Sequence, residues 1–391
     1  MEADAALALG PAIPAVNGRP VRVLFVGAFP PPGRAVFGGM VSSCRALLNS
    51  SLPQRVELDL LDSTQVSNPP PNLAIRFVLA VRRVGCYVWR FERRRPDAVL
   101  LFAAVGASLV EKGAMAWYAR LRGVAAFLFP RGGGILDECR TSRVTRWWVG
   151  IAFRGARKVF CQSETWQRFA VETLGIPLQN APVIPNWTAS RELLAVGRAR
   201  QPGREGPVRL LFLGWLDREK GAGELLEACR KVASAHEITL DIVGEGNYSE
   251  IARQFVADHG LTRIVGFNGW LDAEELVAAL AAADVLVLPS WAEGLPNAMI
   301  EAMASRLAVV VSSVGGIPDV VVNGEHALLV PPRDAAALEV ALTRIIDDPV
   351  LRNRLADAGH ALAEDRFNVE RAVDQMVGEF IALRQGSAAG R

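Results

Sequence analysis

Short apolar segments of strand length alternate with longer helical patterns along the chain. Six of these segments fall in each half, at 21–29, 56–62, 97–102, 125–130, 158–163 and 181–186, and then at 209–214, 238–244, 263–270, 284–289, 307–312 and 326–332. Strands that alternate with helices form parallel sheets covered by those helices. The pattern therefore predicts an α/β protein of two doubly wound, Rossmann-like domains. Ligand sites in such folds lie at the carboxyl ends of the strands, here facing the cleft between the domains.

Length and one polar interruption set the domain boundaries. With 391 residues, 51% of them hydrophobic, the chain is long enough for two domains with full cores. Residues 191–207 are polar and contain Gly and Pro, which is typical of a linker. We therefore expect a first domain at 21–190 and a second at 208–366.

The charge of the chain is divided unevenly between its halves. The net charge is only +2, but residues 1–190 hold 23 Lys and Arg against 12 Asp and Glu, whereas residues 191–391 hold 20 against 29. The first half thus carries a net charge of +11 and the second of −9. The two domains are expected to be electrostatically different bodies.

Composition argues for a reduced compartment and against a metal site. The five cysteines show neither CxxC nor metal-ligand spacing, so a disulfide framework or a zinc site is not expected and a cytoplasmic location fits best. The apolar stretch in residues 1–20 lacks a preceding basic segment, and no run of 18 apolar residues occurs. We expect residues 1–20 to be a flexible tail. With four His and no D-x-D, metal-chelated binding of a nucleotide is poorly supported.

The segment PSWAEGLPNAMIE at 289–301 places two carboxylates, Glu293 and Glu301, eight positions apart across a turn. Pro296 suits the first turn of a helix, where its missing N–H costs nothing, so a helix is predicted from Asn297. The free N–H groups of a helix start favour a phosphate. Glu293 in the loop is placed to accept hydrogen bonds from sugar hydroxyls, and Glu301 from ribose hydroxyls. The alternative is that both are solvated surface residues.

This spacing, followed by EAMASRLAVVVSSVGGIPDVV, resembles the signature of the retaining family 4 glycosyltransferases, among the glycosyl transferases group 1. The resemblance extends over roughly 207–365 and continues more weakly towards the N-terminus. It implies a GT-B fold, a nucleotide-diphosphate sugar as donor in the second domain, no metal and no other cofactor. It also implies that residues 367–385, which include an amphipathic stretch from Val369 to Leu383, form a helix that crosses back to the first domain.

The segment LFLGWLDREKG at 211–221 puts Lys220 at the start of a predicted helix. A cation there opposes the helix dipole, so a bound anion would explain it better than structure alone. The resemblance implies that Lys220 binds the donor diphosphate. The family usually has an Arg directly after Gly214, and this chain has Trp215, so a bidentate cationic contact is missing. A solvated helix residue is the alternative for Lys220.

Two segments of the first domain are candidates for the other side of the cleft. Gly38 and Gly39 resemble the glycine loop of the family, where backbone N–H groups can approach a phosphate or an acceptor; a simple turn is the alternative. Arg131 follows the fourth strand, where many members place a His. Arg131 does not deprotonate and cannot be a base, but it can stabilise the departing phosphate. A structural Arg in a tight turn is the alternative.

Three further loops belong to the implied donor site. Gly244 and Gly269 end strands that the family uses around the nucleotide, and Asp319 in GGIPD is interpreted first as a cap for the following helix. The implied catalytic residues are Glu293, Lys220 and Arg131. The implied donor-binding residues are Gly214, Lys220, Gly244, Gly269, Glu293, Gly294, Leu295, Pro296, Asn297 and Glu301.

Basic and aromatic residues are mixed in two segments, RRVGCYVWRFERRRP at 82–96 and RTSRVTRWWVGIAFRGARK at 140–158. Helices that bind anionic membrane surfaces have this composition, because cations meet the headgroups and aromatics lie at the boundary. Ordinary core packing is the alternative, and no nucleic-acid motif accompanies the charge. We therefore expect a peripheral location on the inner face of a membrane and an acceptor that is lipid-linked or a saccharide.

The function predicted is thus the transfer of a sugar from a nucleotide-diphosphate donor to a hydroxyl, with retention and without metal. A sugar-nucleotide epimerase of the same fold would use the donor site without an acceptor. A non-catalytic protein that binds nucleotide sugars is the third class, favoured by Trp215 and Arg131 and opposed by Glu293, Lys220 and Glu301.

Overall fold

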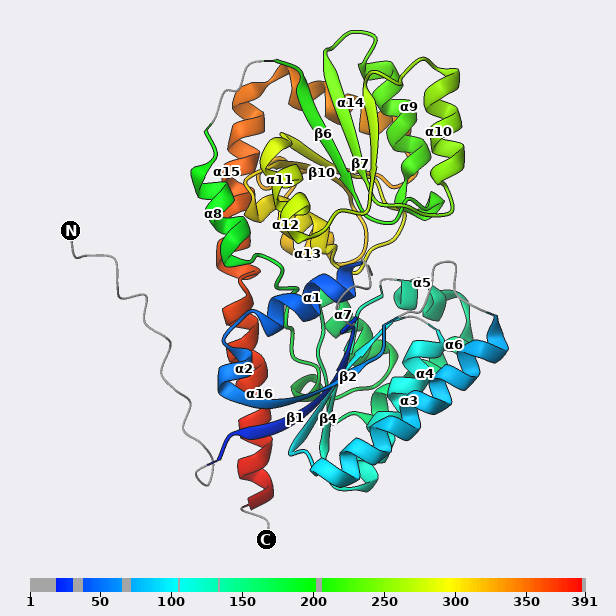
Figure 1. Cartoon of the computed structure of the whole chain (residues 1–391), viewed down its shortest axis with the longest axis vertical. Coiled ribbons are helices and arrows are strands. Elements are labelled where there is room, and N and C mark those ends of the chain that lie inside the picture. Colours follow the sequence, from blue (N-terminus) through cyan, green and yellow to red (C-terminus); the bar gives the residue numbers. More distant parts are fainter. Residues whose placement is uncertain are drawn as a thin grey trace, which may run out of the picture.

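The computed structural model describes residues 19–30, 38–64, 72–104, 106–132, 134–201 and 206–388. Figure 1 shows two α/β bodies, one above the other, with long helices from the end of the chain along one side of both. The predicted tail lies outside the described residues except for its last two positions. No helix among the described residues is long and apolar enough to cross a membrane.

The first domain is built on a parallel sheet in the order β2-β1-β3-β4-β5. Its central strands are buried on both faces, which explains their continuous apolar sequences. The strands are β1 (Val21–Gly27), β2 (Val56–Asp62), β3 (Ala98–Ala103), β4 (Ala125–Pro130) and β5 (Lys158–Val159).

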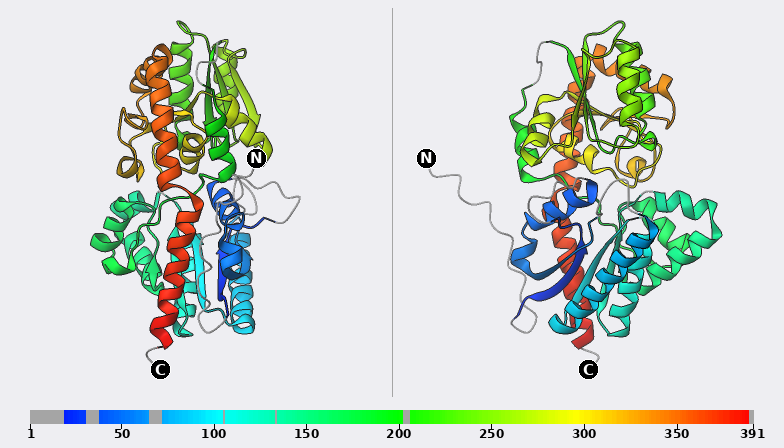
Figure 2. Two further views of the ribbon diagram at one scale, coloured as in Figure 1. Left: turned by 90° about the vertical axis from the view of Figure 1, so that its left-hand side faces the viewer. Right: turned by 45° about the vertical axis from the view of Figure 1, so that its right-hand side comes forward.

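Helices cover both faces of this sheet, as Figure 2 shows in two further views. They are α1 (Gly39–Leu48), α2 (Leu52–Arg55), α3 (Leu73–Arg94), α4 (Ala107–Leu121), α5 (Gly134–Thr141), α6 (Arg143–Gly155) and α7 (Glu164–Arg168), with a π-helical turn at Phe169–Thr173 and a 3-10 turn at Leu178–Asn180.

The prediction of a strand at 181–186 is wrong. Only Val183 pairs there, through a single bridge to Cys161, because the segment carries proline at 182 and 185 and cannot donate a regular ladder. The extended segment still places Asn186 in the cleft, and the buried Trp187 beside it donates to the Ser43 carbonyl.

The second domain has a parallel sheet in the order β11-β10-β9-β6-β7-β8. Its strands are β6 (Val208–Leu213), β7 (Ile238–Val243), β8 (Val265–Gly269), β9 (Val285–Leu288), β10 (Ala308–Ser312) and β11 (Leu328–Val330). Its helices are α9 (Ala222–Val232), α10 (Ser249–Asp258), α11 (Ala273–Ala282), α12 (Asn297–Ala304), α13 (Ile317–Val320), α14 (Ala335–Asp347) and α15 (Pro349–Arg366), with a 3-10 turn at Arg218–Lys220.

Two segments connect the domains. Much of the polar stretch at 191–207 forms helix α8 (Arg191–Ala199), whose buried Leu193 and Leu194 belong to the core of the second domain. After α15, helix α16 (Val369–Ala388) runs down the first domain, in red in Figure 1, and its Phe380 ring lies 4.9 Å from that of Phe127. The chain therefore crosses between the domains twice, and the two crossing segments pair through a single bridge between Ala189 and Asn368.

Candidate active site

The carboxyl ends of the two sheets face each other across a cleft. A cavity of about 740 Å³ lies there and is lined by both domains, from Arg131 and Gly132 on one side to Lys220 and Glu293 on the other. A smaller cavity of about 180 Å³ adjoins it, and Gly39, Lys220, Glu293, Pro296 and Asn297 line both. Ligands of doubly wound folds bind in such places.

The loop between β9 and α12 forms one wall of this cleft. Pro296 caps α12, so Asn297 is the first helical residue and the N–H groups of the helix start open towards the cleft. A pair of glycines holds the loop in place: a Cβ on Gly315, at φ 58°, would lie 1.8 Å from the Glu293 carbonyl oxygen. The Gly316 N–H donates to the Gly294 carbonyl at 2.7 Å. The position of Glu293 is thus set by its own loop together with the glycine pair that packs against it.

Lys220 and Glu293 form an ion pair at the centre of the cleft. The Lys220 Nζ to Glu293 Oε1 distance is 2.6 Å, and the side chains are 30% and 13% exposed. Lys220 ends the 3-10 turn that precedes α9, close to the helix start predicted for it. The pair joins two predicted site residues that are 73 positions apart in the chain.

Glu301 lies in the smaller cavity and is buried. Burial raises the pKa of this carboxyl from 4.5 to about 7, and the charge of Arg45, on α1 of the first domain, opposes that rise. A carboxyl that titrates near neutrality can either donate to or accept from a hydroxyl of a ligand. Its position on the second turn of α12 keeps it apart from Glu293.

Asn297 is the point where the two domains meet. Its Nδ2 donates to the Gly39 carbonyl at 2.6 Å and to Ser43 Oγ at 2.8 Å, both on α1. Its Oδ1 accepts from Asn186 Nδ2 at 2.8 Å. The glycine pair of α1 thus lies against the start of α12, since a Cβ on Gly39 would lie 3.3 Å from this amide. Ser43 and Asn186 were missed by the sequence analysis, although Asn186 ends one of its apolar segments.

Arg131 lines the larger cavity from the first domain. Its guanidinium donates to Asn186 Oδ1 at 2.6 Å and also to Ser43 Oγ, and it lies 5.0 Å from the centroid of the Trp187 ring. Burial lowers its pKa to about 10, which leaves it charged at neutral pH. Arg131 therefore supplies a fixed positive charge beside the point of domain contact.

Trp215 packs against Trp270, with ring centroids 4.7 Å apart in an edge-to-face arrangement. Both line the smaller cavity together with Glu301. Of the predicted glycines, Gly214 lines this cavity, and a Cβ on Gly244 would lie 1.9 Å from the Gly214 carbonyl oxygen. Gly269 lies behind them and accepts from the Gly244 N–H at 2.7 Å. Two aromatic rings thus occupy the place where the resemblance implies an Arg directly after Gly214.

The interpretation of Asp319 as a cap of the next helix is wrong. Its carboxylate accepts from the Thr165 N–H at 2.8 Å and from Thr165 Oγ1 at 2.9 Å, so it caps α7 of the first domain. Asp319 is instead a contact between the domains, next to the glycine pair at 315 and 316.

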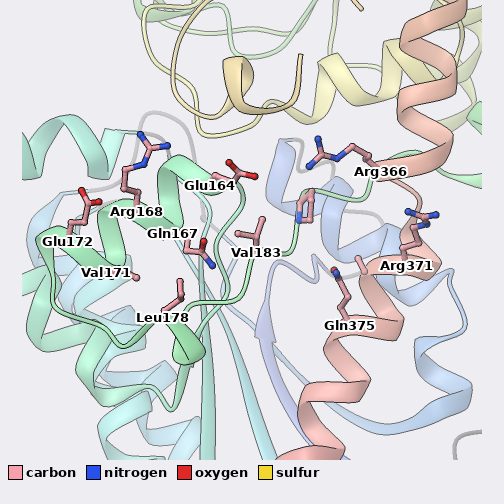
Figure 3. A pocket seen from close by; sticks show the side chains of 12 residues that line it. Glu164, Gln167, Arg168, Val171, Glu172, Leu178, Val183, Arg366, Arg371 and Gln375 are labelled. Carbon is pink, nitrogen blue, oxygen red and sulfur yellow. The ribbon is translucent and has the colours of Figure 1, made fainter. Parts of the chain in front are cut away.

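A further cavity, of about 580 Å³, lies beside the junction of α15 and α16. Figure 3 shows Glu164, Arg168 and Glu172 on one of its walls and Arg366 and Arg371 on the other. None of the predicted site residues lines it. We therefore assign the site to the cleft between the domains. No group of His, Cys, Asp or Glu residues suited to a metal ion occurs among the described residues.

The fold matches that of solved structures. Sucrose-phosphate synthase from Thermosynechococcus elongatus superimposes with a TM-score of 0.77 and 22% identity over 94% of this chain and 100% of that one. HepE from Anabaena, solved in complex with UDP-glucose, superimposes with a TM-score of 0.67 and 20% identity over 92% of this chain and 99% of that one. This is the GT-B fold.

Sequence comparison places the second domain within a family. Residues 207–348 match the model of the family Glycosyl transferases group 1. Glycogen synthase of Mycobacterium tuberculosis is 33% identical over 189 residues, 48% of this chain and 45% of that protein. The 2-deoxystreptamine glucosyltransferase of Streptomyces kanamyceticus is 34% identical over 172 residues, 44% of each. The chain spans about half the length of these relatives, and its second domain belongs to the group 1 glycosyltransferases.

Proposed function

We propose that this protein is a retaining, metal-independent glycosyltransferase of the family 4 type, which transfers a sugar from a nucleotide diphosphate to a hydroxyl. The observation that carries the proposal is the Lys220–Glu293 pair, held at 2.6 Å beside the start of α12 and opposite Gly39 of the first domain. A cation can bind the diphosphate of such a donor, and a carboxylate beside it can accept hydrogen bonds from sugar hydroxyls. The relative HepE was solved with UDP-glucose, which supports a donor of the same class.

The donor would lie across both cavities. The nucleoside occupies the smaller one, where Glu301 accepts from ribose hydroxyls and Trp270 contacts the base. The diphosphate takes Lys220 and the N–H groups of the α12 start as its partners, since both favour an anion. The sugar then reaches Glu293 in the larger cavity. Donor binding thus breaks the ion pair between Lys220 and Glu293, and each of the two side chains then contacts the substrate.

Catalysis in this arrangement comes from stabilising the leaving group. Negative charge grows on the diphosphate as the bond to the sugar breaks, and Lys220 and Arg131 present positive charge to it from opposite walls of the cleft. The acceptor hydroxyl attacks from the same face as the leaving phosphate, whose oxygen takes the proton. The sequence identifies no carboxylate pair as nucleophile and acid, although Glu138 and Glu219 also line the larger cavity.

A panel of nucleotides and sugar nucleotides tests the donor assignment. We expect one base to raise the melting temperature, because a ligand that binds only the folded state stabilises it. Turnover should require an added acceptor and should survive EDTA, and the anomeric proton of the product should show the donor's configuration by NMR. Conversion of the sugar nucleotide without acceptor would identify an epimerase instead.

The first domain also presents a surface suited to an anionic membrane. Helices α3, α4 and α6 lie side by side on it (Figure 1). They leave large apolar side chains exposed, up to 81% at Leu121. We call this the apolar-basic face, defined by Phe77, Val81 and Trp89 on α3, Leu121 on α4, and Val144, Trp147 and Trp148 on α6.

The same helices carry many arginines, so this part of the first domain combines apolar anchors with positive charge. We infer that it binds anionic lipid and brings a lipid-linked acceptor to the cleft. The full chain should sediment with phosphatidylglycerol vesicles at low salt, and a smaller fraction should sediment with them at high salt. It should not sediment with phosphatidylcholine vesicles. Replacing Trp147 and Trp148 by Ser should weaken the binding to these vesicles. Replacing Val340 and Val350, which are exposed on the second domain, by Ser should leave it unchanged.

A further inference from the structure

Arg333 has a backbone conformation that L side chains rarely adopt. Its φ is 62°, and it follows two prolines in the turn that leads into α14. The residue after proline in such a turn is usually Gly or Asn, which tolerate the left-handed region. An arginine here is strained, and strain at the edge of a cleft points to a function for the side chain.

The two other described non-glycine residues with positive φ are also arginines, and each has a structural role. Arg95 ends α3, and its N–H donates to the Phe91 carbonyl at 2.8 Å. Arg306 pairs with Asp357 at 2.5 Å. Arg333, by contrast, forms no hydrogen bond or ion pair with any residue that the structure describes. Hydrogen bonds and ion pairs within the described residues therefore do not account for its side chain.

The guanidinium of Arg333 lies on an aromatic ring that faces the cleft. Its Cζ is 4.4 Å from the centroid of the Trp291 ring, and that of Arg218 is 5.6 Å away. The ring is held by its backbone N–H, which donates to the Glu219 carbonyl at 2.8 Å, and by Nε1, which donates to Glu224 at 3.0 Å. Stacking orients a guanidinium while leaving its N–H groups available.

Arg333 and Trp291 line the 740 Å³ cavity next to Glu293. The two other cations that line it are engaged, Lys220 with Glu293 and Arg131 with Asn186. Glu138 and Glu219 also line it, but neither forms an ion pair with Arg333. Among the described residues that line this cavity, Arg333 is thus the cation whose N–H donors are not already paired.

Trp215, which follows Gly214, brings no charge to the smaller cavity, so Lys220 is the one cation that lines it within the described residues. We propose that Arg333, assisted by Arg218 on the same Trp291 ring, binds a phosphate group of a substrate. A planar guanidinium can donate two parallel hydrogen bonds to a phosphate, which Lys220 cannot. The phosphate belongs either to the donor diphosphate or to a phosphorylated acceptor. The inference rests on the proposed function, because it concerns a substrate of the same cleft.

Calorimetric titration of the full chain with UDP, GDP, ADP and inorganic pyrophosphate tests the site. The variant is Arg333→Gly, which relieves the strained φ and should raise the melting temperature by about 1–3 °C. Arg95→Gly is the matched control, since it removes the same charge from another left-handed position. Arg333→Gly should lower the affinity for the phosphate ligand roughly tenfold, and Arg218→Ala should lower it by a smaller factor. Arg95→Gly should leave this affinity unchanged.

The source of the phosphate follows from two readouts. Weaker nucleoside-diphosphate binding assigns the site to the donor. Unchanged nucleotide binding with a raised KM for a prenyl phosphate acceptor, and no change for the matching alcohol, assigns it to the acceptor. If Arg333→Gly alters neither, the inference is overturned.

Failure of the proposed function would look different. The wild-type chain would then bind no nucleotide and transfer no sugar. In that case, pyrophosphate binding that Arg333→Gly abolishes still supports the phosphate site, and wild-type protein that binds no pyrophosphate overturns it.

Discussion

The two domains share a topology but determine their halves of the cleft in different ways. In the second domain a strand, a turn and a helix within 285–304 set both Glu293 and Glu301, and backbone contacts from Gly315 and Gly316 hold the turn. In the first domain Arg131 is held by Asn186 and Ser43, 55 and 88 positions away. The two glutamates of the donor half thus come from one short stretch of sequence, whereas the facing half depends on contacts between residues distant in the chain.

The sharpest way to break this contrast is to remove the central ion pair. Lys220→Met and Glu293→Gln should each lower kcat by about 10²–10³, because each removes charge that acts on the transition state. The fold should survive, since both side chains are partly exposed in the cleft. Lys231→Met, on the outer surface of α9 where Lys231 pairs with Glu339, is the control and should leave turnover unchanged. Wild-type kcat in either cleft variant would show that the pair is structural.

The buried carboxyl of Glu301 links the donor site to stability. Because its pKa is raised from 4.5 to about 7, the folded chain holds a proton that the unfolded chain has released between these values. The free energy of unfolding should therefore fall as pH rises through this window, by about 3 kcal/mol, and level off above pH 7. Glu301→Gln should lose this pH dependence in urea unfolding, and Glu274→Gln, exposed on α11, should keep it.

Arg131 tests the first-domain half with a smaller expected effect. Arg131→Met keeps the contact with the aromatic rings but removes the charge, and kcat should fall roughly tenfold. Donor affinity should change less than kcat, since the charge acts on the leaving group. A change in melting temperature with unchanged kcat would mean that Arg131 only packs the contact between the domains.

The smallest effect is expected where the domains touch through Asp319. Asp319→Ala removes the cap of α7 and should lower the free energy of unfolding by about 0.5–2 kcal/mol. Asp241→Ala, in β7 away from this contact, is a comparison for the loss of a carboxylate in the same domain. Stability unchanged by Asp319→Ala would show that the cap does not couple the domains.

The same contrast explains what the sequence could predict. Periodicity revealed eleven strands because each lies in a short apolar segment, and it failed at 181–186, where prolines interrupt an equally apolar segment. Glu293 and Glu301 could be predicted together because they lie on one strand–turn–helix unit. The partner of Asp319, the role of Asn297 between the domains and the strain at Arg333 depend on segments distant in the chain, which no local pattern records.

The central claim is that the second domain holds a nucleotide-diphosphate sugar between Lys220, Glu293 and Glu301. Calorimetric titration of the wild type and Glu301→Ala with UDP, GDP, ADP and their sugars tests it most directly. We predict that one nucleotide series binds the wild type at one site per chain and binds the variant at least tenfold more weakly. No binding by the wild type, or equal binding by both proteins, would contradict the account.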